Sequence, residues 1–147
     1  MKNFREIIIR FIDILASFLG FIILLPFIII IFILIYKNGK EPFFYQERLG
    51  KNMKKFILIK FRTMAIGTEN CATHLVDATK ITKLGKFLRK TKLDEIPQLY
   101  NVFRGEMSFV GPRPCLPTQI NLIDLRRKYN LYRYKPGITG LAQVKGI

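Results

Sequence analysis

The sequence predicts one small α/β or α+β domain, mostly helical with a small β-hairpin or sheet, joined to an N-terminal membrane helix. Three observations predict this fold class. Residues 14–36 contain no charged residue, two short apolar-aromatic runs flank Gly50-Lys-Asn, and three later segments have the spacing or boundary residues of helices. A chain of 147 residues can bury one modest core. We divide it into a membrane-associated segment, residues 1–38, and a domain of residues 39–147.

The uncharged run is long enough to enter or cross a membrane. As a straight helix rising about 1.5 Å per residue it would measure about 34 Å, against a hydrocarbon core of about 30 Å. Pro26 lies near its middle, where the ring removes a backbone donor and clashes with the carbonyl of Ile22, so we expect a kink. Basic residues flank both ends, which favours the cytoplasmic side for each. A re-entrant helix broken at Pro26 satisfies both observations, and a kinked spanning helix remains the alternative.

After this run the sequence predicts a hairpin and a loop. Residues 42–46 and 56–62 are short apolar-aromatic runs separated by Gly50-Lys-Asn, as expected for two strands joined by a turn. Residues 63–80 are polar and weakly patterned, so we expect a loop or a short helix there.

Three helices are expected in the remainder, from apolar spacing or from boundary residues. They cover residues 81–90, 94–103 and 117–130. The segment Gly111-Pro112-Arg113-Pro114 cannot form regular structure because two prolines bracket the arginine. Pro136-Gly137 predicts a turn.

The charge balance points to an anionic partner. Lys and Arg total 25 against 10 for Asp and Glu, giving a formal net charge of +15. Nucleic acid, anionic lipid head groups and phosphorylated substrates all fit this excess, but no nucleic-acid-binding motif is recognisable. Cys71, Cys115 and His74 have neither metal-ligand nor disulfide spacing, so we expect free thiols and a histidine that binds no metal.

The acid pair Asp94-Glu95 is the main candidate for chemistry. Pro97 is tolerated only in the first turn of a helix, which makes Asp94 an N-cap candidate with Glu95 at the first helical position. The positive end of the helix dipole and neighbouring cations would then favour the ionised form of both carboxylates. The plain alternative is an N-cap followed by an acid that complements the dipole.

Cations in fixed positions turn this pair into a candidate phosphate-transfer site. A carboxylate can attack phosphorus when the phosphate charge is neutralised, and Mg²⁺ binds through one or two carboxylates plus substrate phosphate oxygens. We therefore expect Asp94 to be a nucleophile and Glu95 a Mg²⁺ ligand. Arg89 and Arg113 are expected to bind phosphate.

Five stretches of the chain resemble the bacterial sugar transferases, the monotopic polyprenyl-phosphate sugar-1-phosphate transferases. They run in family order and, with the N-terminal segment, cover nearly the whole chain. The stretches are Gln46-Glu-Arg-Leu-Gly50, Lys60-Phe-Arg-Thr-Met64, Leu93-Asp-Glu-Ile-Pro-Gln-Leu99, Met107-Ser-Phe-Val-Gly-Pro-Arg-Pro114 and Lys135-Pro-Gly-Ile-Thr-Gly-Leu-Ala-Gln-Val144.

The resemblance implies a phosphoglycosyl transferase that moves a sugar-1-phosphate from a UDP-sugar to polyprenyl (undecaprenyl) phosphate and releases UMP. It implies that Asp94 forms a covalent phosphosugar intermediate, that Glu95 helps hold Mg²⁺, and that the membrane helix is re-entrant. The family's substrate-contacting positions correspond to Arg89, Arg113, Lys60, Arg62 and Gln143. The resemblance places the enzyme at the bacterial inner membrane, with its catalytic domain, residues 39–147, on the cytoplasmic face and no role for nucleic acid.

The chain departs from the family pattern at two places. It has Leu25-Pro26 where family members often have Ser-Pro, and it stops at Ile147, whereas family catalytic domains usually continue for some tens of residues. We therefore keep one alternative: a truncated, catalytically inactive membrane-associated family member, or a partner protein of a full-length enzyme.

Overall fold

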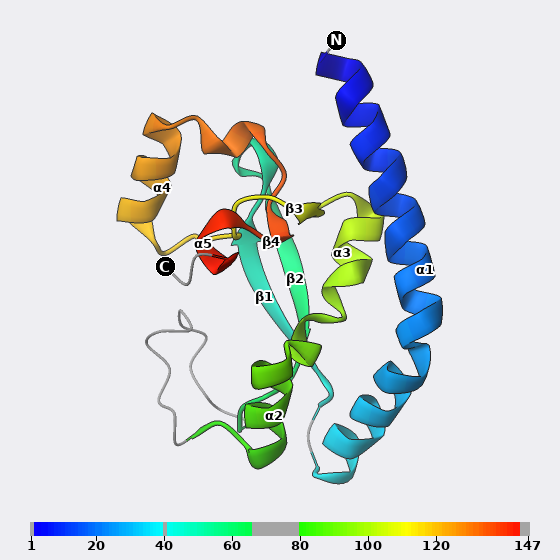
Figure 1. The fold of residues 1–147 in the computed structure, drawn as a ribbon. Coiled ribbons are helices and arrows are strands. Elements are labelled where there is room, and N and C mark those ends of the chain that lie inside the picture. Colours follow the sequence, from blue (N-terminus) through cyan, green and yellow to red (C-terminus); the bar gives the residue numbers. More distant parts are fainter. Residues whose placement is uncertain (1, 40, 66–79, 145–147) are drawn as a thin grey trace.

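The computed structural model describes residues 2–39, 41–65 and 80–144, apart from the side chains of residues 2, 3, 142 and 143. Figure 1 shows a long helix, α1, along one side, with α3 between it and a central hairpin and α4 on the far side of the hairpin. The elements are α1 Lys2–Lys37, β1 Phe43–Leu49, η1 Lys51–Met53, β2 Lys55–Phe61, α2 Lys83–Thr91, η4 Leu93–Glu95, α3 Gln98–Arg104, β3 Ser108–Val110, α4 Ile120–Lys128, η5 Leu131–Arg133, β4 Gly137–Thr139 and α5 Leu141–Val144, where η marks a 3₁₀ turn.

Helix α1 is long and apolar enough over Phe4–Lys37 to cross a membrane. It continues through Pro26, which is exposed, because a proline inside a helix removes one hydrogen bond without having to end it. Figure 1 shows its axis changing direction in the light-blue part towards its C-terminal end. The helix therefore does not end at Pro26, and re-entrant insertion remains a prediction.

The predicted hairpin is confirmed. Strands β1 and β2 pair antiparallel, with Phe43 opposite Phe61 and Leu49 opposite Lys55. Strand β1 ends three residues later than expected, because the turn is a compact one in which the Gly50 N–H donates to the Lys54 carbonyl at 2.8 Å.

A second pair of strands was not expected from the sequence. Strands β3 and β4 pair in parallel, with Ser108 opposite Gly137 and Val110 opposite Thr139. The prediction of a turn at Pro136-Gly137 is wrong, since the Pro136 carbonyl accepts from the Ser108 N–H at 2.9 Å and Gly137 begins the strand. Strands of three residues are too short for alternation to reveal.

The three predicted helices are present, though not at every predicted boundary, and the four-residue helix α5 was not predicted. Helix α2 lies within one or two residues of its expected position, and α4 is shorter than predicted at both ends. Helix α3 begins at Gln98, not Asp94, so the prediction of Asp94 as an N-cap is wrong. Lys92 has a left-handed backbone (φ 61°) that ends α2, and the 3₁₀ turn η4 then takes the acid pair. The expected loop, residues 63–80, lies largely outside the described residues.

The main core joins α1 to the hairpin and to the two helices that flank the acid pair. Its buried members come from α1, β2, α2 and the segment around α3: Ile31, Ile35, Phe61, Leu88, Ile96 and Leu99. Gly20 allows the close approach of α1 to α3, because a Cβ atom there would lie 3.2 Å from the Leu99 Cδ1 atom.

Polar contacts fix the first half of α1 to the same core. The Arg10 guanidinium donates to the carbonyls of Val102 and Phe103 at 2.7 and 2.6 Å, which satisfies two carbonyls at the C-terminal end of α3. Asp13, only 3% exposed, accepts from the Ser108 hydroxyl at 3.0 Å and the Phe109 N–H at 3.3 Å. These contacts fix the position of α1 relative to the elements around the acid pair.

Candidate active site

The acid pair lies on a tight turn between α2 and α3, packed against β2. Asp94 is 7% exposed, and the Glu95 side chain is 11% exposed. Successive residues of a 3₁₀ turn point in different directions, so the two carboxylates face different neighbours.

Glu95 faces two cations from distant parts of the chain. The Lys60 Nζ atom of β2 donates to its Oε1 atom at 2.9 Å, and an Arg113 guanidinium nitrogen lies 3.9 Å from the same oxygen. The Lys60 side chain is 18% exposed and that of Arg113 is 39% exposed. Lys60 is therefore largely enclosed, while Arg113 retains a face towards solvent where an anion can bind.

Asp94 is buried without a partner for one oxygen. Its Oδ1 atom is inaccessible and has no hydrogen-bond partner among the described residues. Burial raises the pKa of Asp94, with Glu95 adding to the rise, while the positive charges of Lys60, Arg89 and Lys92 oppose it. The expectation that the pair's surroundings would favour the ionised form is wrong in direction for Asp94, because the carboxyl lies inside the fold and not at a helix N-terminus.

Burial also changes the lysine. The pKa of Lys60 is lowered by desolvation, and the charges of Glu95 and Asp94 only partly restore it. Lys60 and Asp94 are thus each shifted towards the neutral form by enclosure, and they support each other's charge. Shifts of this kind are common at sites that perform chemistry.

Arg89 and Arg113 are each oriented by neighbouring residues. The Arg89 Nε atom donates to the Thr63 hydroxyl at 2.9 Å, which fixes the guanidinium beside the acid pair. The carbonyl of Arg113 accepts from Arg126 of α4 at 2.6 Å, and that of Pro114 accepts from Arg48 at 3.0 Å. The irregular loop predicted over Gly111–Pro114 is confirmed.

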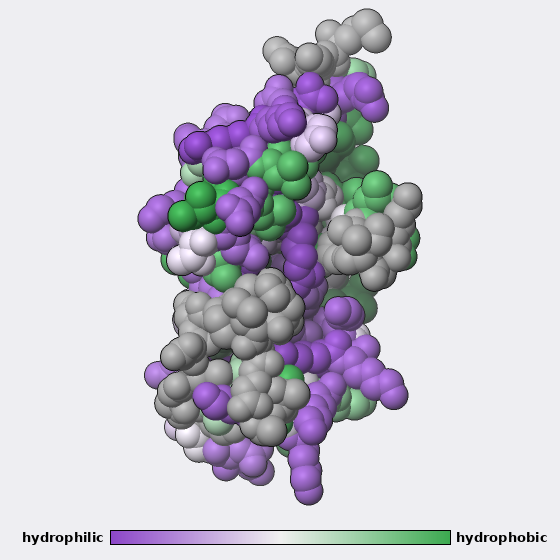
Figure 2. Space-filling model, turned by 90° about the vertical axis from the view of Figure 1, so that its left-hand side faces the viewer, coloured by the Kyte–Doolittle hydropathy of each residue, from purple (hydrophilic) through white to green (hydrophobic). Residues whose placement is uncertain are grey.

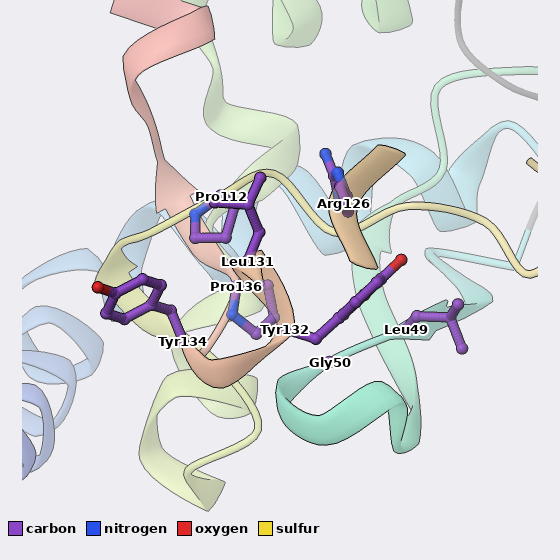
Figure 3. A pocket seen from close by; sticks show the side chains of 8 residues that line it. All are labelled: Leu49, Gly50, Pro112, Arg126, Leu131, Tyr132, Tyr134 and Pro136. Atoms are coloured by element: carbon purple, nitrogen blue, oxygen red, sulfur yellow. The ribbon is translucent and has the colours of Figure 1, made fainter. Parts of the chain in front are cut away.

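The loop that carries Arg113 lies beside a small, closely packed pocket. Figure 3 shows the eight residues around a small pocket there, among them Pro112, Arg126, Tyr132 and Pro136. Its volume of about 10 Å³ holds at most one water molecule. The lining residues are therefore closely packed, and this pocket cannot hold a substrate.

Sequence reasoning missed one buried cation of the site. Arg48 is 8% exposed, donates to the Gln46 side-chain oxygen, and has its pKa lowered to about 10 by burial, with Arg113 contributing. The signal was present in the Gln46-Glu-Arg-Leu-Gly50 stretch, because residues two apart on a strand share one face. Arg48 lies with Lys60, Glu95 and Arg113 around one small cavity of about 10 Å³.

Two predicted site residues are not placed at the acid pair. Arg62 lies beyond the end of β2 and donates to the Glu41 carboxylate at 3.0 Å and to the carbonyls of Glu41 and Phe43 at 2.9 and 3.2 Å. Its prediction as a substrate-binding residue has no structural support. Gln143 belongs to α5, and its side chain lies outside the described residues. Cys115 is a buried free cysteine as expected, while Cys71 and His74 lie outside the described residues.

The donor set suits a magnesium ion carried by a diphosphate more than a metal held by the protein alone. No group of three acidic, histidine or cysteine side chains gathers within the described ranges. Two carboxylates are adjacent, and Asp94 contributes a buried oxygen with no partner among the described residues. Mg²⁺ commonly binds through one or two carboxylates, with phosphate oxygens and water completing its coordination, so the residues fit that mode.

Comparison with known proteins places these residues in a family context. A sequence model described as "Bacterial sugar transferase" matches residues 4–147. An "Uncharacterized sugar transferase" of Haemophilus influenzae is 36% identical over 99% of this chain and 34% of its own length. "Galactosyl transferase CpsE" of Streptococcus agalactiae is 40% identical over 93% of this chain and 33% of its own.

A third relative has a more specific name. "UDP-glucose:undecaprenyl-phosphate glucose-1-phosphate transferase" of Klebsiella pneumoniae is 40% identical over 91% of this chain and 30% of its own length. The chain thus spans about a third of the length of these three relatives.

Proposed function

Because the chain belongs to the bacterial sugar transferase family, we propose that it transfers a sugar-1-phosphate from a UDP-sugar to polyprenyl phosphate and releases UMP. The observation that carries the proposal is the Asp94 carboxyl, buried with one oxygen unpaired among the described residues and with the positive charges of Lys60, Arg89 and Lys92 acting on it. The name of the Klebsiella relative, which specifies undecaprenyl phosphate and a glucose-1-phosphate, agrees with it. These points favour the enzyme over an inactive family member.

In the first half-reaction an Asp94 carboxylate oxygen attacks the phosphorus attached to the sugar. A bond forms between that oxygen and phosphorus, and the bond from phosphorus to the bridging oxygen breaks. The bridging oxygen keeps the electron pair and leaves as part of UMP. The result is an acyl phosphate that joins Asp94 to the sugar-1-phosphate.

In the second half-reaction a phosphate oxygen of the polyprenyl phosphate attacks the same phosphorus. The bond between phosphorus and the Asp94 oxygen breaks, which regenerates the carboxylate and yields polyprenyl diphosphate sugar. Two attacks at one phosphorus by negatively charged groups require strong charge neutralisation. Arg113, Arg89 and Lys60 supply it. Of the two cations beside Glu95, Arg113 has the more exposed side chain.

We propose that Glu95 would help to hold a magnesium ion at the diphosphate, beside the Asp94 nucleophile. When bound, magnesium neutralises diphosphate charge and lowers the barrier to departure of UMP. Lys60 holds Glu95 in place at 2.9 Å, which fixes the position of its carboxylate beside Asp94.

The proposed acceptor also gives a location. Polyprenyl phosphate lies in a membrane, and α1 is apolar over most of its length with most of its surface uncovered by the rest of the chain. We propose that α1 holds the domain at the cytoplasmic face of the bacterial inner membrane, so that Asp94 lies within reach of the lipid phosphate.

The test is UMP release by protein purified in detergent or lipid nanoparticles, with Mg²⁺, polyprenyl phosphate and a panel of UDP-sugars. Asp94→Asn removes the nucleophile and should reduce release by about 10³-fold or more. Asp124→Asn is the matched control, because Asp124 lies on α4 in an exposed ion pair with Arg127.

Mass spectrometry after incubation with donor alone gives the second measurement. A sugar-phosphate adduct on the Asp94 peptide is expected in the unaltered protein and in Asp124→Asn. Undiminished UMP release by Asp94→Asn would exclude Asp94 as the nucleophile.

A further inference from the structure

A groove lined by residues of α1, α3, β3 and β4 reaches Glu95 of the acid pair. Its volume is about 400 Å³, and its lining is mostly apolar. Leu24 comes from α1, Leu99 from α3, Phe109 from β3 and Ile138 from β4, while Lys92 and Glu95 are the charged residues of the lining. The groove is therefore apolar along most of its wall and charged where it reaches the acid pair.

The apolar wall continues onto the surface of α1. Leu24 is half-buried in the groove, while its neighbours Ile23 and Leu25 are 68% and 51% exposed. An apolar chain lying against α1 can therefore enter beside Leu24 without crossing a polar surface. A hydrocarbon chain gains about 25 cal/mol for each Å² that it buries in this way.

Lys92 is placed at the charged end by an unusual backbone. It is exposed and has φ 61° at the junction of α2 and η4, a conformation that costs a residue with a Cβ atom about 1 kcal/mol or more. The structure gives its ammonium group no hydrogen-bond or ion-pair partner among the described residues, and its charge acts on Asp94 two residues away. A cation in this position complements an anion that enters along the groove.

We propose that this groove holds the first isoprene units of the polyprenyl phosphate acceptor and that Lys92 binds its phosphate. This inference rests on the proposed function and names the residues that would select the acceptor. The apolar wall matches the chain, and the ammonium group matches the phosphate. The groove reaches Glu95, next to Asp94, which would carry the phosphorus that the acceptor oxygen attacks. A phospholipid with one acyl chain in the groove is the competing occupant.

The test measures binding directly, with farnesyl phosphate as a short acceptor probe and farnesol as the same chain without the phosphate. Lys92→Asn removes the charge and keeps a residue that tolerates a left-handed backbone. We expect it to weaken farnesyl phosphate binding about tenfold, as loss of one charge-assisted contact does, and to leave farnesol binding unchanged. Lys92→Arg should restore most of the affinity.

Lys90→Asn is the matched control, because Lys90 is an exposed lysine on α2 two residues away that does not line the groove. Leu24→Gln tests the apolar wall and should weaken both probes. Equal binding of farnesyl phosphate by Lys92→Asn and the unaltered protein would overturn the role of Lys92. Displacement of farnesyl phosphate by equimolar phosphatidic acid would overturn the choice of occupant.

A separate measurement keeps this result apart from the proposed function. Exchange of labelled UMP into the UDP-sugar needs only the first half-reaction and no acceptor. Absence of exchange in the unaltered, folded protein counts against the proposed function, whereas the binding comparison decides on the groove by itself.

Discussion

At the scale of single residues, the most informative feature is that the predicted nucleophile is enclosed. A carboxylate with an unsatisfied oxygen in the interior is destabilising. The charges of Lys60, Arg89 and Lys92 partly offset this cost for Asp94, which forms no ion pair of its own with any residue that the structure describes. The buried position lowers the stability of the fold, but it leaves the carboxylate poorly solvated and therefore reactive. The same enclosure raises the pKa of Asp94, so that its protonation state changes at a higher pH than that of an ordinary aspartate.

The first prediction concerns that pH dependence. Because burial raises the pKa of Asp94 above its usual value of 3.8, the carboxyl becomes protonated, and unable to attack phosphorus, at a higher pH than an ordinary aspartate. Adduct formation should fall about tenfold per pH unit below the raised pKa. The measurement is the amount of Asp94 adduct formed from UDP-sugar in single-turnover reactions between pH 4 and pH 8.

The same shift has a consequence for stability with a defined sign. The folded protein binds the Asp94 proton more tightly than the unfolded chain, so this group lowers the free energy of unfolding as pH rises from the ordinary pKa through the raised one. Asp94→Asn should therefore be as stable as the unaltered protein at pH 7, or more stable, while inactive. A Tm lower at pH 7 than at pH 4 in the unaltered protein, but not in Asp94→Asn, would agree. For the first prediction, an amount of Asp94 adduct that stays constant down to pH 4 would contradict the raised pKa of Asp94.

Most of the residues that the sequence predicted for the candidate site lie together in the structure. Asp94, Glu95, Lys60, Arg89 and Arg113 were all expected, and the structure brings their charges together. Arg62 is not brought to the acid pair, because β2 ends at Phe61 and Arg62 binds Glu41, so its role in substrate binding stays a prediction.

Arg48 was missed for a related reason. Which face of β1 lies towards Arg113 depends on the packing of segments more than 60 residues apart, as in the Arg48 bond to the Pro114 carbonyl. Strand alternation predicts that residues share a face, but it does not predict what that face contacts.

At the scale of elements, the site depends on how closely α2 approaches the end of β2. Gly85 makes this approach feasible, because a Cβ atom there would lie 2.8 Å from the carbonyl carbon of Thr63 and 2.9 Å from its Cα atom. Thr63 also accepts from the Thr82 N–H at 3.1 Å and holds Arg89 through its hydroxyl. One close contact between backbones thus positions a guanidinium beside the acid pair.

The second prediction follows from this contact. Gly85→Ala should push α2 away from Thr63 and lower the free energy of unfolding by about 1–3 kcal/mol, with a fall in Tm of roughly 3–10 °C. The direction is informative, because alanine is about 1 kcal/mol better than glycine in an unobstructed helix. Thermal unfolding in detergent and UMP release measure the two effects, and release should fall more than stability alone explains because Arg89 moves.

Lys86→Ala is the matched control, since Lys86 is an exposed neighbour on the same helix. It should leave both Tm and UMP release nearly unchanged. A Gly85→Ala protein with a higher Tm would mean that α2 does not lie against Thr63.

The elements that the sequence did not predict share one property. Strands β3 and β4 have three residues each, and η4 is a single turn. Periodicity needs several repeats before it can be recognised, whereas these elements form because residues 108–110 and 137–139 meet in the folded chain. The hairpin and α2 were predictable because local pattern and tertiary packing agree there.

At the scale of the whole molecule, apolar and charged surfaces are separated. Figure 2 shows mainly hydrophilic side chains outside the grey atoms on the face that forms the left-hand side of Figure 1, away from α1. Helix α1 carries the opposite surface, with many large apolar side chains exposed along its length. The sequence predicted both surfaces, but not that Arg10 and Asp13 fasten α1 to residues more than 90 positions away.

The third prediction tests whether the apolar helix α1 or the basic surface holds the protein at the membrane. Ile23 is 68% exposed on α1 and far from the polar contacts of Arg10 and Asp13. Ile23→Asp should weaken membrane association, since an acid in the middle of a membrane helix costs about 2.5–3.5 kcal/mol, while leaving the fold of the domain intact. Flotation with liposomes, at low salt and at about 1 M NaCl where charges are screened beyond about 3 Å, provides the measurement.

Ile23→Leu is the control and should float like the unaltered protein under both conditions. Release of the unaltered protein by salt alone would show that its basic surface, and not α1, holds it at the membrane.

The bond between Asp13 and Ser108 also has a consequence for biosynthesis. The two residues are 95 positions apart, and a ribosome that adds about 5–20 residues per second needs roughly 5–20 s to make that stretch. Helix α1 therefore emerges from the ribosome before Val102, Phe103 and Ser108, so that Arg10 and Asp13 cannot yet form these contacts. The nascent helix must therefore find lipid or a chaperone before its own domain can receive it.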